Sequence, residues 1–270
     1  MAARDPDTET LVEPERQNEQ TTFLLADVDA EAIADDCYDN PTRIYNPFIT
    51  HMITNPAKQG WDARNMMGNI PMTTRVWCFN RFGQTQTHVP GLNSNTIPDD
   101  DDAPGDESYR TIYIGGEHED FYDPDFVIYN DVVVVHGDET AARPNDIAVY
   151  GYPDDEFLPT DFHTATYYRE PAQRGDNGGT PERDYIYIIG GLGYPGSDHR
   201  KETVTQRLDL QDYSVERVHT TGDVPPPHRH AKARLENNDM IVVTWGKEEE
   251  HRYGLHIPDL RWEKLSRVSS

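Results

Sequence analysis

The sequence predicts an all-β protein over residues 71–270, built from repeated sheets of short strands. Runs rich in Val, Ile, Tyr and Trp recur here: RVWCF at 75–79, TIYI at 111–114, 126–135, 147–150, YIYII at 185–189 and MIVVTW at 240–245. Turn residues bound these runs, notably the glycine pairs Gly115-Gly116 and Gly190-Gly191. No stretch of strong helical periodicity follows Pro71, so we expect strands to dominate.

The first 70 residues have a different character. Residues 1–20 contain almost no apolar side chains and are expected to be disordered. From Thr21, the segment TTFLLADVDAEAIADDC spaces its apolar residues roughly as a helix does, and three prolines then interrupt the chain. We therefore divide the chain into a disordered acidic N-terminus (1–20), a partly helical extension that packs on the main domain (21–70), and the β domain (71–270).

The β domain contains an internal repeat of three units. The first reads FGQTQTHV, TIYIGGEHED, VIYNDVVVVHG and DIAVYGYP, the second TDFHTATYY, YIYIIGGLG and VTQRLDLQDYSVERV, and the third PHRHAKARL, MIVVTWGKEE and GLHIPDLRWEKL. Each unit has a Thr or His start, a strand that ends at glycine, a polar loop and a further pair of strands. Glycine suits the strand ends, because a residue without a Cβ lets the chain turn sharply and lets a second backbone approach.

The repeat resembles the kelch repeat. The features that carry the resemblance are the glycine pairs, Leu208-Asp209-Leu210, Pro258-Asp259-Leu260 with Trp262, and the link GDVPPPHRH. The third unit departs from the pattern, with Trp245-Gly246 in place of a glycine pair. The resemblance implies a β-propeller, in which four-stranded blades surround a central channel, with about three blades in this chain.

Three blades are fewer than the roughly 4–8 with which propellers typically close, so sheet edges would remain exposed. Residues 21–70 would cover an edge or complete another blade, or two chains would combine as a homodimer. The sequence does not choose between these arrangements. A different sandwich or barrel is the alternative to a propeller.

Composition limits the kinds of partner. The chain has a formal net charge of −25 and a pI of about 4.6, which repels phosphate backbones and anionic lipid, so we expect neither nucleic acid nor membrane as a partner. Lysine is rare beside arginine, which suits either a halophilic protein or a GC-rich genome. Cys37 and Cys78 are too few for a disulfide framework, and no signal peptide or membrane span is recognisable. A cytoplasmic location is expected.

The densest polar cluster lies in the segment GGEHEDFYDPDF, after the first glycine pair. Its candidate binding residues are Glu117, His118, Glu119, Asp120 and Asp123. Imidazole and carboxylate together suit a divalent metal, but the spacing matches no metal signature, and a solvated acidic loop is the simpler interpretation. Whether a metal binds stays open.

A second group of candidates recurs at the start of each repeat unit. Asp161, His163 and Thr164 lie in the second unit, and their counterparts are Thr87-His88 in the first unit and His228, Arg229 and His230 in the third. A histidine that begins each unit is expected to be structural and to hydrogen-bond to a neighbouring sheet. The functional alternative is a ring of His and carboxylate groups at the mouth of a channel, which would titrate or bind a ligand.

Familiar catalytic motifs are missing from the sequence, which has neither a Gly-x-Ser-x-Gly elbow nor a phosphate-binding Gly-x-x-x-x-Gly-Lys loop. We therefore expect a non-catalytic kelch-type module that binds a protein partner without a cofactor, with contacts from residues such as Glu119, Phe121, Tyr122 and Asp123. The alternative is an enzyme, or a protein that binds a small molecule or metal, with Glu117, His118, Asp161, His163 and His230 near the channel.

Overall fold

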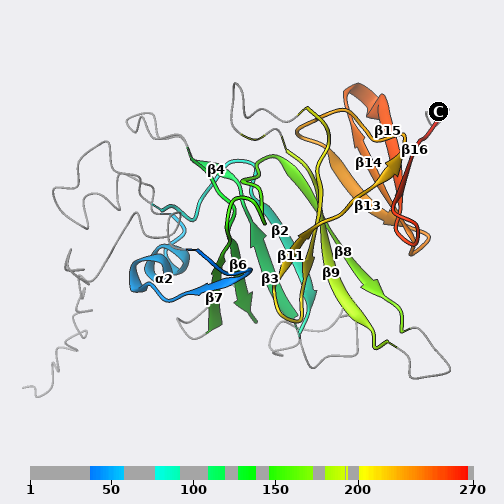
Figure 1. The fold of residues 1–270 in the computed structure, drawn as a ribbon. Helices are drawn as coiled ribbons and strands as arrows, with labels where there is room; N and C mark the ends of the chain where they lie inside the picture. The colour runs from blue at the N-terminus through cyan, green and yellow to red at the C-terminus, as the bar shows by residue number, and fades with distance from the viewer. Residues whose placement is uncertain are drawn as a thin grey trace, which may run out of the picture.

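The computed structural model describes residues 37–57, 77–91, 109–118, 127–137, 146–172, 180–191, 193 and 201–266. Within these ranges the chain consists mainly of antiparallel sheets, which confirms the all-β prediction (Figure 1). Three large sheets stack face to face, and each of the three repeated segments forms one of them. A closed ring of sheets is not seen among these strands. None of the helices in this part of the chain has the length and apolar character needed to cross a membrane.

The first sheet is a meander of four strands: β2 (Thr85–Pro90), β3 (Tyr109–Ile114), β6 (Val132–His136) and β7 (Ile147–Gly151). A short strand from the N-terminal extension, β1 (Thr42–Ile44), pairs antiparallel with β7. Between β3 and β6 the chain forms a small hairpin of β4 (Glu117–His118) and β5 (Val127–Ile128). The apolar run predicted at 126–135 is therefore divided between two strands.

The second sheet contains β8 (His163–Glu170), β9 (Arg183–Gly190), β10 (Thr205–Asp209) and β11 (Val215–Arg217), each antiparallel to the next. The third contains β13 (Lys232–Glu236), β14 (Met240–Trp245), β15 (His251–His256) and β16 (Arg261–Lys264). A 3₁₀ turn, η5 (Lys247–Glu249), joins β14 to β15. A two-residue strand, β12 (Thr221–Gly222), pairs parallel with β16.

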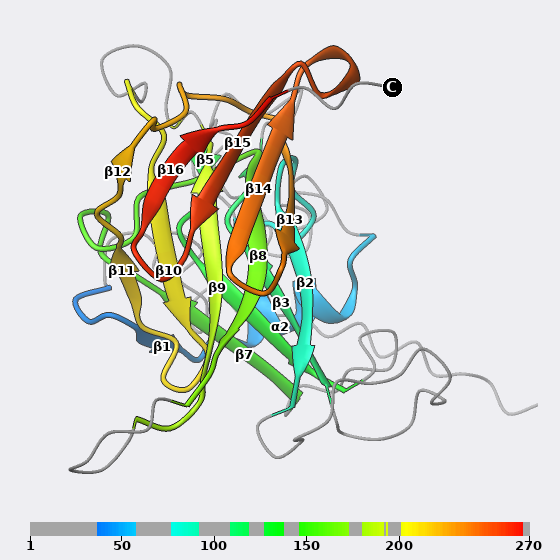
Figure 2. The ribbon, with the colours of Figure 1, turned by 90° about the vertical axis from the view of Figure 1, so that its right-hand side faces the viewer.

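Apolar side chains on both faces of the first two sheets build three layers of core. Helix α2 (Pro47–Thr54) covers one face of the first sheet, and its other face packs on the second sheet. The second sheet packs in turn on the third, as Figures 1 and 2 show. The strand runs VVVV and YIYII are buried on both faces, which is why they read as continuous rather than alternating apolar runs.

One predicted strand is wrong in its described part. The sequence predicts a strand at 75–79, but residues 77–79 have no strand conformation. Trp77 and Phe79 instead join the core between α2 and the first sheet. Both edges of that sheet are already taken by β1 and β2, so these apolar residues contribute by covering its face.

Three devices cover the outer edges of the sheets. Strand β1 lies along the first sheet and β12 along the third. At the second sheet the side chain of Asn40 takes the place of a strand: its Nδ2 donates to the carbonyl of Val215 at 2.6 Å, and its Oδ1 accepts from the Val215 amide at 2.8 Å. A short strand or a side chain can pair with the backbone groups of an edge strand without creating a new long edge that another chain could join. The N-terminal extension thus contributes to edge coverage through residues 40–44.

Candidate binding surface at the loop end of the sheets

The loops that enter the first strands of the three sheets are tied together at one end of the stack. We call them the entry loops: residues 81–84, 159–162 and 228–231. Phe162 N donates to the carbonyl of Gly83 at 3.0 Å, which joins the first two loops. Phe82 and Glu117 exchange two backbone hydrogen bonds of 2.9 and 2.7 Å, and Gly116 N donates to the carbonyl of Thr160 at 2.8 Å. The first two entry loops and the β4–β5 hairpin therefore form one backbone-bonded unit, and the third entry loop meets it through the ring contact of Phe162 with His230.

Aromatic side chains lie on this unit. Phe82 is 64% exposed, and few large apolar side chains in the described ranges are more open to solvent. The ring of Phe162 meets the imidazole of His230 edge-on, with centroids 4.3 Å apart. Gly83 allows the close approach, because a Cβ there would lie 2.4 Å from Phe162 N and 2.8 Å from its ring. We call Phe82, Gly83, Phe162, Arg229 and His230 the entry patch.

Two members of the entry patch have a backbone conformation that their side chains disfavour. Phe162 has φ +46° and His230 has φ +56°. Positive φ is uncommon outside glycine and is an outlier for a bulky residue such as Phe. Strain of this kind persists where surrounding contacts enforce it, and it is concentrated at functional sites.

A buried ion pair supports the entry patch from below. The Arg81 guanidinium binds both carboxylate oxygens of Asp131, at 2.5 and 2.8 Å, and the Trp77 indole N–H donates to the same carboxylate at 2.7 Å. Arg81 also donates to the carbonyls of Cys78 and Gly115, and its guanidinium lies over the rings of Trp77 and Tyr129. Burial opposes the charge on Arg81, but the Asp131 carboxylate outweighs burial and raises the pKa of Arg81. Arg81 and Asp131 thus fix the backbone that presents Phe82.

Two of the histidines at the starts of the repeat units, His163 and His228, are buried between sheets, whereas His88 is exposed. His163 is the first residue of β8, and its Nε2 and Thr85 Oγ1 of the first sheet form a 2.8 Å hydrogen bond. His228 stacks on Trp245 with ring centroids 4.2 Å apart, and its Nδ1 and the carbonyl of Pro226 are 3.0 Å apart. Burial lowers the pKa of His228, which favours the neutral ring that donates from Nδ1. These contacts agree with a structural role for both rings, whereas His230 is exposed.

The remaining candidates are placed as follows. Glu117 and His118 form β4, beside Phe82, and His118 is buried. Asp161 is buried, and its Oδ1 accepts from the amide of Gly193 at 3.3 Å. Glu119, Asp120 and Asp123, together with Phe121 and Tyr122, lie outside the described residues. The structure therefore places Glu117, Asp161, His163 and His230 at the same end of the stack, on or next to the entry loops.

A metal site is not formed by the candidates that the structure describes. Among the described residues, no three His, Cys, Asp or Glu side chains are grouped closely enough to hold a metal ion. Each metal type suited to His and carboxylates needs several such ligands converging on one point. What Glu117, His118, Asp161, His163 and His230 share is a location on the loop end, not a common coordination centre.

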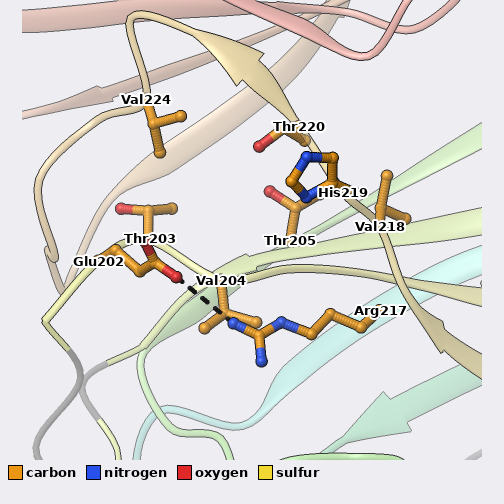
Figure 3. Close-up of a pocket in the computed structure, with 9 residues that line it drawn as sticks. All are labelled: Glu202, Thr203, Val204, Thr205, Arg217, Val218, His219, Thr220 and Val224. Carbon is orange, nitrogen blue, oxygen red and sulfur yellow. Dashed lines mark hydrogen bonds and ion pairs between the residues drawn. The ribbon is translucent and has the colours of Figure 1, made fainter.

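A separate polar cavity lies where the chain passes from the second sheet to the third (Figure 3). Its volume is about 270 Å³, and an ion pair of 3.5 Å joins Arg217 to Glu202 in its wall. The Thr203 hydroxyl donates to the carbonyl of Pro226, whereas the buried Thr205 hydroxyl has no partner in the described part of the chain. The lining residues are Glu202, Thr203, Val204, Thr205, Arg217, Val218, His219, Thr220 and Val224. None of them belongs to the candidates from the sequence.

Sequence reasoning did not identify Arg81, Asp131, Phe82 or Phe162. The local signal that could have pointed to Phe82 and Phe162 is that each stands in the opening segment of its repeat unit, FGQTQTHV and TDFHTATYY. In the comparison with known proteins, no family model matches the chain, and no curated protein matches it either.

Proposed function

We propose that this chain is a protein-interaction module of the kelch-like β-propeller type, with the three sheets as its blades, and that it binds its partner through the entry patch without catalysis. The observation that carries the proposal is the exposed Phe82 on the entry loop that is hydrogen-bonded to the loop of Phe162, whose ring in turn contacts His230 of the third sheet's entry loop.

The chemistry of the entry patch suits a protein partner. Aromatic residues and arginine are enriched in protein interfaces and supply much of their binding energy, and the entry patch contains two Phe, one His and Arg229. Phe82 buries little of its ring in the free chain, so covering it on binding gains apolar contact area that folding has not used.

Rigidity is the second support for this function. The backbone bonds between the entry loops and the ion pair of Arg81 with Asp131 hold Phe82 and Phe162 in place before a partner arrives. A surface that is already ordered loses less conformational entropy on binding. Loops on a rigid sheet scaffold are a common location for binding residues.

The test is a pull-down from native lysate, at the salt concentration of the host, with Phe82→Ala compared against wild type. A stoichiometric partner that wild type retains and Phe82→Ala loses supports the proposal. The matched control is Tyr38→Ala, which also removes an exposed aromatic side chain, 80% exposed, but in the N-terminal extension. Equal recovery of the partner by wild type and Phe82→Ala would contradict the use of the entry patch.

The cavity at the second sheet favours the alternative, a protein that binds a small molecule. Its volume fits a small polar molecule, and its lining offers threonine hydroxyls, one imidazole and the Arg217–Glu202 pair. If this alternative holds, a set of metabolites screened by thermal unfolding will contain one that stabilises wild type and not Thr205→Val.

A further inference from the structure

We propose that the free edge of β13 binds an extended peptide segment of the partner in which acidic and apolar residues alternate. This inference rests on the proposed interaction function and names the chemistry of the segment that the module recognises. The edge lies directly after the entry patch, since β13 begins two residues after His230. Figure 2 shows β13 as the last strand at one side of the third sheet.

One edge of β13 carries no backbone partner. The strand pairs with β14 over all five of its residues, from Lys232 opposite Thr244 to Glu236 opposite Met240. In the part of the chain that the structure describes, no backbone hydrogen bond connects β13 to any other element. The first strands of the other two sheets, β2 and β8, are likewise paired on one side only, whereas β1, Asn40 and β12 cover the opposite edges of the three sheets. An uncovered edge is a template for an additional strand.

The charge of this edge is opposite to that of the molecule. The segment 229–236 reads RHAKARLE and carries three cationic side chains, Arg229, Lys232 and Arg234, against one carboxylate, Glu236, in a chain of net charge −25. Lys232 and Arg234 are exposed; Arg234 pairs with Glu236 and Glu249, whereas Lys232 makes no ion pair with any described residue. Charge attraction acts over about one Debye length, roughly 8 Å at physiological salt. A bound acidic segment therefore responds mainly to Lys232 and its near neighbours rather than to the excess of carboxylates elsewhere in the chain.

The two faces of β13 determine the pattern of the bound segment. Ala233 and Leu235 pack toward the core between the second and third sheets, while Lys232 and Arg234 lie on the opposite, solvated face. An added antiparallel or parallel strand places its own side chains alternately beside each group. Acidic side chains then lie beside Lys232 and Arg234, and apolar ones beside Ala233 and Leu235. The edge thus selects a segment whose acidic and apolar side chains alternate, in addition to selecting its net charge.

The experiment measures binding of a fluorescein-labelled peptide of alternating Glu and Val, followed by fluorescence anisotropy with the full chain. We expect saturable binding that weakens about tenfold or more in the double variant Lys232→Glu with Arg234→Glu, and that weakens as salt rises. The matched control is Arg261→Glu with Lys264→Glu, which reverses the same number of exposed charges on β16, away from the free edge. Hydrogen exchange is expected to slow at the β13 amides when the peptide is present.

Several outcomes would overturn the proposal. They are the absence of saturable binding up to about 1 mM peptide, equal binding of a peptide that carries N-methyl groups on alternate amides, and equal weakening by the β16 control. The interaction function is judged separately, by the pull-down. A partner lost by Phe82→Ala but retained by the β13 double variant would reject the edge as the recognition element and leave the module intact.

Discussion

The two ends of the sheet stack are terminated in different ways. At the first sheet, α2 and the segment of Trp77 and Phe79 bury the outer face. At the third sheet, the outer face carries charged side chains that pair with one another: Arg234 and Arg252 with Glu236, and His256 with Glu263. Apolar side chains therefore bury the outer face of the first sheet, whereas the outer face of the third sheet is charged and faces water.

This difference bears on whether a further sheet can pack on the stack. A sheet that packs on another sheet needs apolar side chains on that face, as the second sheet has on both of its faces. On the outer face of the third sheet, Met240 and Leu265 lie over Gly254, and the ion pairs surround them. Such a face suits water better than another apolar sheet.

The largest expected effect comes from breaking the ion pair under the first sheet. Asp131→Ala leaves the Arg81 guanidinium buried without its carboxylate, and its side chain is 0% exposed. Removing one partner of such a pair destabilises a protein by about 3–5 kcal/mol. Urea unfolding measures the loss. Glu202→Ala is the control, because it breaks the exposed pair with Arg217 and should cost less than about 1 kcal/mol.

A second prediction tests the apolar cover of the first sheet. Met52 of α2 is 0% exposed, and Met52→Ala creates a cavity against that sheet. We expect a loss of about 3 kcal/mol in the free energy of unfolding, within the usual range for such a truncation. Thr54→Ala, on the exposed side of the same helix, should change stability by less than about 1 kcal/mol. Equal effects of the two changes would show that α2 does not close this end.

Two substitutions in the wall of the cavity between the second and third sheets should change the free energy of unfolding in opposite directions. Thr205→Val replaces a buried hydroxyl that has no partner in the described chain, so it should raise the free energy of unfolding by about 1 kcal/mol. Thr203→Val removes the hydroxyl that donates to Pro226, so it should lower that energy by about 1 kcal/mol. Thermal or urea unfolding of both variants measures these changes. A lower stability of both variants would show that the Thr205 hydroxyl has a partner.

The contact between the second and third sheets should also depend on pH. Burial lowers the pKa of His228 below its ordinary value of 6.5, so the unfolded chain binds the proton more readily than the folded chain. The contribution of His228 is therefore fully present above about pH 6.5 and is lost as the pH falls through the lower, folded pKa. Unfolding at pH 7.5 and 5.5 should show a smaller pH dependence in His228→Gln than in wild type, and equal pH dependence in the two proteins would contradict the prediction.

Sequence reasoning succeeded where the signal was local. Runs such as YIYII and the glycines that end them are dictated by neighbouring residues, and they correctly indicated an all-β chain. The support of the entry patch depends instead on contacts between distant positions. Arg81 and Asp131 are 50 residues apart, and Asn40 and Val215 are 175 apart. Nothing in the spacing of either pair distinguishes it from the many other Arg, Asp and Asn residues of this acidic chain.

The smallest expected effect belongs to the charged outer face of the third sheet. Glu236 pairs with Arg234 at 2.8 Å and with Arg252 at 3.3 Å, and its side chain is 27% exposed. Glu236→Gln keeps the shape and removes the charge, so we expect a loss below about 1 kcal/mol that shrinks further in high salt. Urea unfolding at low and high salt measures it. A loss as large as that of Asp131→Ala would mean that another surface covers this face, and the stack would then continue beyond the third sheet.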